Sequence, residues 1–304
     1  MKTLEKIFGK VAIPLMTPFT QTYAVDYKRA CQLAERLIEK KYCDALIVAG
    51  TNGEFHALDH SERIQLFKEI KNAVGDGFRL IAGTGATTTA ETIQLTKEAE
   101  ALGYQAAMVL PPYYGIPTQD ELIEHFASLA DATSLPIVLY NIPIFTNVNI
   151  EPATAVKLAE IGNIVGIKEE AALMPIQTSD IMMKLPKEVD FSVYCGDDVM
   201  VLSVLAQGGS GSVSGGAHIV GDLLMSMVEK FFNGQVREAT ELHHKIFKFA
   251  RTLGIGHRIN PIPMTKMSLA LTGFEIGPPR KPFLPPVKDE IEAMKSVLIE
   301  IGKL

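Results

Sequence analysis

Short apolar runs recur along the chain, and polar segments with helical spacing separate them. Several runs are unbroken rather than alternating, as expected for strands buried on both faces of a parallel sheet. The last run is the weakest because it has little apolar content. Eight strands are predicted in this way, at residues 11–16, 45–49, 80–82, 106–110, 137–140, 164–167, 191–194 and 211–214.

The segments between these runs carry helix signals. An apolar stripe from Ala30 to Ile38 has the spacing i, i+3, i+4, i+7, i+8 and follows a candidate N-cap at Asp26. Thr88 and Thr118 are each followed three residues later by a glutamate, which is the capping-box pattern at the start of a helix. The pattern therefore alternates strand and helix.

Regular alternation of this kind predicts a (β/α)8 TIM barrel over residues 1–222. Residues 223–304 are predicted to form a C-terminal helical extension packed on the barrel, with helices at 223–232, 237–253, 263–272 and 287–301. The alternative fold is an open doubly wound sheet. Its G-x-G-x-x-G turn does not follow the first strand.

Composition narrows the class of protein. The 304 residues are 47% hydrophobic and 21% charged, which is ordinary for a globular protein. The net charge of −6 argues against nucleic-acid binding, which needs a basic face, and no apolar run reaches the roughly 18–20 residues that span a bilayer. The three cysteines form no C-x-x-C pair, so a reducing cytoplasm is the expected location.

In a TIM barrel the active site lies at the C-terminal ends of the strands. Lys168 closes the sixth predicted strand. Burial there disfavours the ammonium form and is expected to lower the pKa of Lys168, giving a nucleophilic amine that can form an imine with a ketone. The alternative is a lysine that pairs with Glu169 or Glu170 at the strand end.

Two further strand ends carry polar groups that suit such an amine. Tyr140 closes the fifth strand and can relay protons, although a core tyrosine bonded to a backbone carbonyl is an alternative. Thr51 can hold that tyrosine through its hydroxyl, and the turn at residues 50–53 offers backbone N–H groups to a carboxylate. A simple glycine-framed turn is the other interpretation.

Metal and cofactor sites are not predicted. His56 and His60 have the spacing i, i+4, but no glutamate lies between them in the H-E-x-x-H arrangement. His243 and His244 are adjacent and would point to different faces of a helix. No cluster of residues has ligand spacing.

Taken together, the strand-end motifs resemble the dihydrodipicolinate synthase / N-acetylneuraminate lyase family. The resemblance rests on Gly-Thr-Asn-Gly-Glu at 50–54, Tyr-Asn-Ile-Pro at 140–143 and Gly-Ile-Lys-Glu at 166–169, in that order and spacing. Further matches lie at 82–85, 111–114 and 260–263, so nearly the whole chain is covered. The resemblance implies a metal-independent class I lyase or synthase on a TIM barrel.

The resemblance also implies roles for individual residues. Lys168 would form the imine with pyruvate or with the 2-oxo end of a substrate, and Tyr140 would be the acid/base. Thr51 would link Tyr140 to Tyr114, which in many family members comes from the neighbouring subunit. A homodimer or a dimer of dimers, the latter a homotetramer, is therefore expected.

The resemblance extends to substrate binding. Thr51 and Asn52 would bind the pyruvyl carboxylate, and Val213 matches the eighth-strand residue whose backbone carbonyl lines the site. Synthases place an arginine for the second substrate's carboxylate where this chain has Phe145. A phenyl ring offers no donor, so Phe145 is expected to disfavour a charged acceptor such as aspartate semialdehyde and to favour a neutral aldehyde.

Two cations of the tail are alternatives for that missing charge. Arg258 or Lys266 would supply it if the tail folds over the barrel mouth. The sugar-binding motif Gly-Tyr-Asp-Glu of the sialic-acid lyases is also not met, because residues 196–199 read Gly-Asp-Asp-Val.

These departures set the order of the functional hypotheses. The leading one is a Schiff-base class I aldolase acting on 2-keto-3-deoxy sugar acids. 4-Hydroxy-tetrahydrodipicolinate synthase comes second, and N-acetylneuraminate lyase or a 2-keto-3-deoxy acid dehydratase third. The non-enzyme alternative is a pyruvate-binding regulatory protein, against which the set of Lys168, Tyr140 and Thr51 argues. The direction of the reaction is left open.

Overall fold

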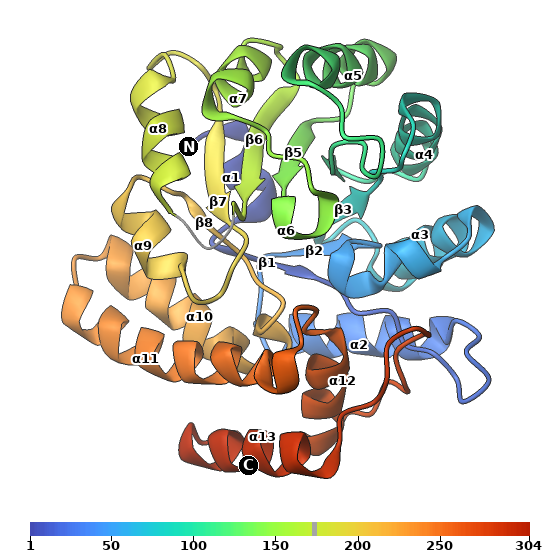
Figure 1. Cartoon of the computed structure of the whole chain (residues 1–304), viewed down its shortest axis with the longest axis vertical. Helices are drawn as coiled ribbons and strands as arrows, with labels where there is room; N and C mark the ends of the chain where they lie inside the picture. The colour runs from blue at the N-terminus through green and yellow to red at the C-terminus, as the bar shows by residue number, and fades with distance from the viewer. Residues whose placement is uncertain (172–174) are drawn as a thin grey trace.

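The strands form a closed, all-parallel barrel. In the computed structural model, which describes residues 1–171 and 175–304, each strand pairs with the next along the chain, and the eighth pairs with the first (Figure 1). The strands are β1 Val11–Pro14, β2 Ala45–Val48, β3 Arg79–Gly83, β4 Ala106–Val109, β5 Ile137–Asn141, β6 Ile164–Glu169, β7 Ser192–Cys195 and β8 Gly211–Val213.

All eight predicted strands are confirmed, and with them the TIM barrel. Their residues are buried with few exceptions, as an apolar run between a barrel interior and a helical layer must be. β6 extends two residues beyond its predicted end, so Lys168 lies within the strand. β8 is poor in apolar residues because Gly211 passes close to the Lys10 carbonyl and the Tyr194 ring, where no side chain fits.

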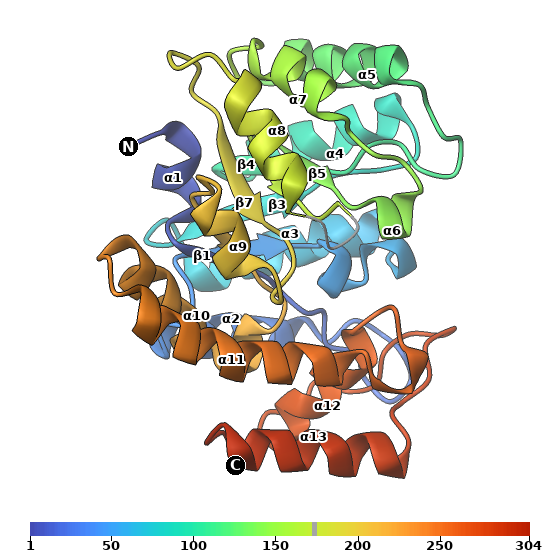
Figure 2. The ribbon, with the colours of Figure 1, turned by 60° about the vertical axis from the view of Figure 1, so that its left-hand side comes forward.

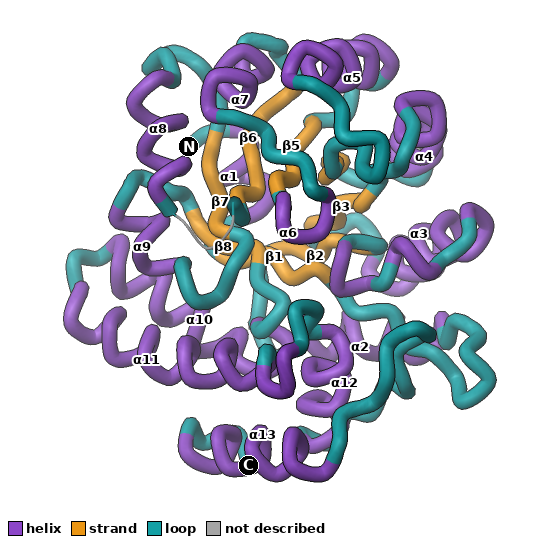
Figure 3. Tube along the Cα trace, in the orientation of Figure 1, coloured by secondary structure: helices purple, strands orange, loops and turns teal. Residues whose placement is uncertain are grey.

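Helices surround the barrel and cover its outer face (Figure 3). Short segments at the strand ends are η1 Thr51–Gly53, η2 Phe55–Ala57 and α6 Pro143–Thr146. The helices up to β8 are α1 Thr3–Phe8, α2 Tyr27–Glu39, α3 His60–Val74, α4 Thr89–Ala101, α5 Gln119–Ala132, α7 Pro152–Ala159, α8 Ile176–Lys184 and α9 Val201–Ala206.

The predicted helix starts hold with one exception. Asp26 accepts a hydrogen bond from the backbone N–H of Arg29 at 2.9 Å. Thr118 and the following glutamate form a complete capping box. Thr88 caps α4, but in the described part of the chain the return bond from Glu91 is missing, so only half of that predicted box forms.

Four helices follow β8, as predicted: α10 Ala217–Phe232, α11 Val236–Leu253, α12 Ile262–Leu271 and α13 Lys288–Glu300, with η3 Ile255–His257 after α11. α11 packs against α10, and α13 packs against α11 (Figure 2). α10 also contacts β1 and begins before residue 222, so the division at 222/223 falls inside this helix. That division stays a prediction.

Within the described residues, no helix is long and apolar enough to cross a membrane.

A buried ion pair fastens the tail to the barrel. Lys266 of α12 lies 2.7 Å from Glu54, which follows β2, and both side chains are almost inaccessible to solvent. Arg280 bonds to Glu62 on α3 and donates its backbone N–H to Glu54. These contacts hold α12 and the segment that follows it against the residues after β2 and against α3.

Candidate active site

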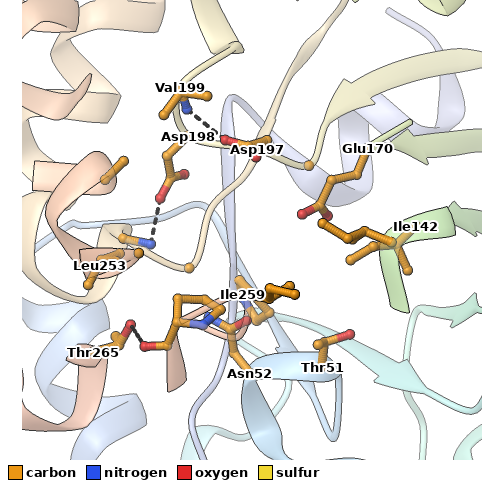
Figure 4. Close-up of a pocket in the computed structure, with 18 of the residues that line it drawn as sticks. Thr51, Asn52, Ile142, Glu170, Asp197, Asp198, Val199, Leu253, Ile259 and Thr265 are labelled. Carbon is orange, nitrogen blue, oxygen red and sulfur yellow. Dashed lines mark hydrogen bonds between the residues drawn. The ribbon is translucent and has the colours of Figure 1, made fainter. Parts of the chain in front are cut away.

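A pocket of about 380 Å³ opens at the carboxyl ends of the strands. Its floor and walls come from the ends of β2, β5 and β6 and from the segments after β7 and β8. The end of α11 and the residues that follow it form the remaining side. Figure 4 shows that residues from both parts of the chain face this space, Thr51 and Glu170 from the barrel and Leu253 and Ile259 from the tail.

Lys168 and Tyr140 lie side by side in this pocket. The register of β5 and β6 makes them direct neighbours, so their side chains point to the same face of the sheet. Lys168 Nζ lies 3.8 Å from the centre of the Tyr140 ring. Both side chains are buried, with Lys168 only 4% exposed. An amine and a phenol are thus held together at the end of a low-dielectric barrel.

Thr51 and Asn52 complete the barrel side of the pocket. Thr51, in η1 after β2, donates its hydroxyl to Tyr140 Oη at 3.3 Å. Asn52 Nδ2 is buried and has no hydrogen-bond partner among the described residues. Gly215 passes so close to this amide that a side chain there would collide with it. Asn52 itself lines the pocket, so this unpartnered amide lies in the pocket wall.

Glu170 also lines the pocket, although the sequence predicted it only as a possible ion-pair partner of Lys168. Its Oε2 lies 3.3 Å from Lys168 Nζ and accepts a hydrogen bond from Tyr140 Oη at 3.3 Å. The two-residue periodicity of a strand could have predicted this position. Residues i and i+2 share a face, so Glu170 points into the barrel mouth as Lys168 does. Glu169, between them, points outward and bonds to Asn141.

The predicted direction of the Lys168 pKa shift is wrong. Burial lowers the pKa of Lys168, as expected, but the neighbouring Tyr140 and Glu170 raise it by more, so that the net pKa is raised. An opposite charge at 3.3 Å favours the ammonium form. The amine therefore rests as an ammonium ion and needs a proton acceptor before it can act as a nucleophile.

Four acidic groups of the pocket have raised pKa values. Burial raises the pKa of Tyr140 to about 12, with Glu170 adding to the rise. Burial raises the pKa of Glu170 to about 7 and that of Asp198 to about 6, and it also raises the pKa of Asp197. Three of these groups are carboxyl groups near one lysine, and they cannot all be ionised at little cost.

Two predicted site residues lie outside the pocket of a single chain. Tyr114 is 94% exposed, and Tyr113 instead lines a neighbouring cavity together with Thr51 and Phe145. Val213 is fully buried at the end of β8, where Gly215 supplies the pocket lining. The roles of Tyr114 and Val213 stay predictions, and that of Tyr114 requires a second chain.

Phe145 lines the pocket as predicted, but the cations differ from those expected. Lys266 is bound to Glu54 and does not line the pocket. Arg258 does line it, yet its guanidinium bonds to Glu290 at 2.8 and 2.9 Å. Arg251, near the end of α11, also lines the pocket, and no carboxylate of the described residues pairs with it. Arg251 was not among the residues predicted from the sequence.

The histidines considered for metal binding do not converge. His60 contacts Glu98 on the outer face, whereas His56 lines the cavity beside Tyr113. In the described part of the chain, no three His, Cys, Asp or Glu side chains are placed to hold a metal ion.

A lysine beside a tyrosine and a threonine at the mouth of a TIM barrel suits the chemistry of a class I aldolase. The chain belongs to the dihydrodipicolinate synthetase family, whose model matches residues 7–301. The 4-hydroxy-tetrahydrodipicolinate synthase of Moorella thermoacetica is 41% identical over 98% of this chain and 99% of that protein.

Solved structures agree with this family. A dihydrodipicolinate synthase from Cyanidioschyzon merolae, solved with lysine bound, is 37% identical with a TM-score of 0.92, covering 98% of this chain and 99% of that one. A monomeric dihydrodipicolinate synthase variant is 32% identical with a TM-score of 0.92, covering 98% of both chains.

Proposed function

We propose that this protein condenses pyruvate, held as an imine on Lys168, with aspartate semialdehyde, as a 4-hydroxy-tetrahydrodipicolinate synthase. The observation that carries the pyruvate half is the cluster of Lys168, Tyr140 and Thr51, with the free amide of Asn52 beside it. In this proposal Lys168 attacks the keto carbon, Tyr140 relays protons and the Asn52 amide binds the pyruvyl carboxylate.

The acceptor is proposed from the relatives and from one cation of the pocket. The expectation of a 2-keto-3-deoxy sugar acid gains no support from the comparisons, because the relatives named above are synthases. The sequence expectation rested on a missing charge at Phe145. Arg251, from the tail, offers a guanidinium in the same pocket, where it can bind the carboxylate of an amino-acid semialdehyde.

A neutral aldehyde is the second candidate acceptor, and Phe145 favours it. The Phe145 ring is 39% exposed and faces the pocket without a hydrogen-bond donor. An anion bound against this ring alone would lose water without compensation. The two candidates differ in one measurable quantity, which is the preference between a charged and a neutral acceptor.

We expect kcat/KM with pyruvate to be higher for aspartate semialdehyde than for glyceraldehyde. Arg251→Gln should lower the value for the semialdehyde by roughly 10- to 100-fold, since a hydrogen bond to a charged group contributes about 1.5–3 kcal/mol. The value for glyceraldehyde should change little. Lys245→Gln, an exposed cation on the same helix that does not line the pocket, is the control. A preference for glyceraldehyde in the parent protein would establish the neutral acceptor instead.

We also propose that two chains share their active sites through Tyr114. Its full exposure in one chain fits a residue that enters a neighbour's pocket. Tyr114→Ala and Lys168→Ala are each expected to be inactive alone. Mixing the two after mild dissociation should restore about a quarter of the parent activity, because hybrid dimers then contain one intact site. Restoration that fails although hybrids are detected by native mass spectrometry would show that Tyr114 does not act across subunits.

A further inference from the structure

Glu170 contacts both reactive groups of the pocket, yet the proposed chemistry assigns it no task. We propose that Glu170 is a catalytic residue, whose carboxylate carries the protons that Lys168 sheds when its amine condenses with the keto carbon of pyruvate. This inference rests on the imine at Lys168 and is independent of the acceptor aldehyde.

The condensation has a fixed proton balance. An ammonium ion and a ketone become an iminium ion and water. Nζ begins with three hydrogens and ends with one, and both lost hydrogens leave on the former keto oxygen. The C–N bond forms when the amine lone pair attacks the keto carbon, and the C–O bond breaks when that oxygen departs as water. No electrons are gained or lost overall, but a group must take protons from nitrogen and deliver them to oxygen.

The geometry places Glu170 where such a group is needed. In the described residues it is the carboxylate that approaches Lys168 Nζ, at 3.3 Å. The keto oxygen is separated from Nζ by one carbon once the C–N bond has formed, so a carboxylate that contacts Nζ also reaches that oxygen. Figure 4 shows the Glu170 side chain extending into the pocket, above Thr51 and beside Ile142.

Tyr140 presents its ring to Lys168 and its hydroxyl to Glu170, so we expect it to act in proton transfer after Glu170. Lys168 Nζ faces the tyrosine ring, 3.8 Å from its centre. The Tyr140 hydroxyl donates to Glu170 and accepts from Thr51. Glu170 therefore contacts both the amine and the phenol, and protons taken from Lys168 can pass through it to Tyr140 or return to the substrate oxygen.

The charges around Glu170 allow it to accept and release protons near neutrality. Burial raises the pKa of Glu170 to about 7, the Lys168 charge opposes that rise, and the nearby Asp197 and Asp198 add to it. General acid–base catalysis is most efficient when the pKa of the group lies near the working pH. The raised pKa of Lys168 makes a neighbouring proton acceptor necessary in the first place.

The test measures imine formation with pyruvate alone. The protein is mixed with pyruvate, quenched with borohydride at increasing times, and the adduct on Lys168 is quantified by mass spectrometry between pH 5.5 and 8.5. Glu170→Gln keeps the size and a hydrogen-bond acceptor but cannot titrate. This variant should trap pyruvate about 10²-fold more slowly or worse, which is the lower end of the range for a general acid–base group. In the parent protein the trapping rate should change with pH near 7, where Glu170 titrates, and the variant should lose this change. Glu170→Asp should retain the pH dependence of the trapping rate and recover part of that rate.

Glu169→Gln is the matched control. It removes a neighbouring buried carboxylate that bonds to Asn141, Gln177 and the backbone of Ala171, away from Lys168. We expect a lower melting temperature for this variant. Its trapping rate per folded molecule, and the change of that rate near pH 7, should match those of the parent protein. Equal slowing in Glu169→Gln and Glu170→Gln would overturn the proposal, because the effect would then be structural.

The remaining outcomes are also decisive. Trapping by Glu170→Gln at the parent rate or faster would overturn the proposal, since Glu170 would then merely hold Lys168 as an ammonium ion. If that variant does not fold, Glu170→Asp decides, and an unchanged rate and pH profile would count against the proposal. A parent protein that forms no adduct on Lys168 would overturn both this inference and the proposed function. Normal trapping with no turnover of aspartate semialdehyde would overturn the acceptor assignment alone.

Discussion

Borohydride reduction in the presence of pyruvate is expected to leave one stable adduct on the chain, at Lys168. Lys168→Arg keeps a positive charge beside Glu170 but cannot form an imine. We expect this variant to form no adduct and to lose turnover by roughly 10⁴-fold or more, as enzymes do when a covalent nucleophile is removed. Peptide mapping of the reduced protein and steady-state assays of the variant measure the two effects.

Lys266 provides an internal control for that experiment. It is also buried, and burial lowers its pKa to about 8, although Glu54 opposes the shift. By pKa alone Lys266 would be the better nucleophile. It lies outside the pocket and is bound to Glu54, so we expect no label there. A label on Lys266, or on any lysine other than Lys168, would contradict the proposed mechanism.

Tyr140→Phe is expected to lower kcat/KM by about 10²–10⁴, the range typical for loss of a general acid–base group. The ring that packs against Lys168 remains, so the melting temperature should change little. The hydroxyl that joins Thr51 to Glu170 is lost, which interrupts the proton relay. Steady-state kinetics and thermal unfolding of the same preparation measure both quantities.

Tyr194→Phe gives the opposite pattern if the assignment is correct. Tyr194 is fully buried and is the register neighbour of Lys168 on β7, but its hydroxyl donates to the backbone carbonyl of Gly9 at 2.6 Å. We expect this variant to melt at a lower temperature and to retain its turnover. A Tyr140→Phe protein that loses less than about threefold in rate at an unchanged melting temperature would assign Tyr140 to packing.

The barrel was predictable because each strand is a short apolar run and because the separating segments carry helix caps such as Asp26 and Thr118. The position of Lys168 beside Tyr140 follows from that barrel, since both close neighbouring parallel strands. These features depend on local sequence and on one rule of topology.

The electrostatics of the site were less predictable. The sign of the Lys168 pKa shift depends on the direction of the Glu170 side chain, and a 3.3 Å contact reverses the effect of burial. Arg251 was missed because its place depends on how α11 lies against the strand ends, which neither its own sequence nor the barrel rule specifies. Tyr114 is fully exposed in a single chain, so one chain cannot show its role.

The pocket has two parts that come from different segments of the chain, the barrel and the tail that the Lys266–Glu54 ion pair attaches to it. The barrel carries the groups proposed to activate pyruvate, whereas the residues after α10 supply much of the wall that an aldehyde would meet, including Arg251, Leu253 and Ile259. Substitutions in the tail can therefore alter the acceptor without touching Lys168 or its neighbours. A protein engineer seeking new carbon–carbon bonds from pyruvate would randomise residues 250–259 and leave the strands untouched.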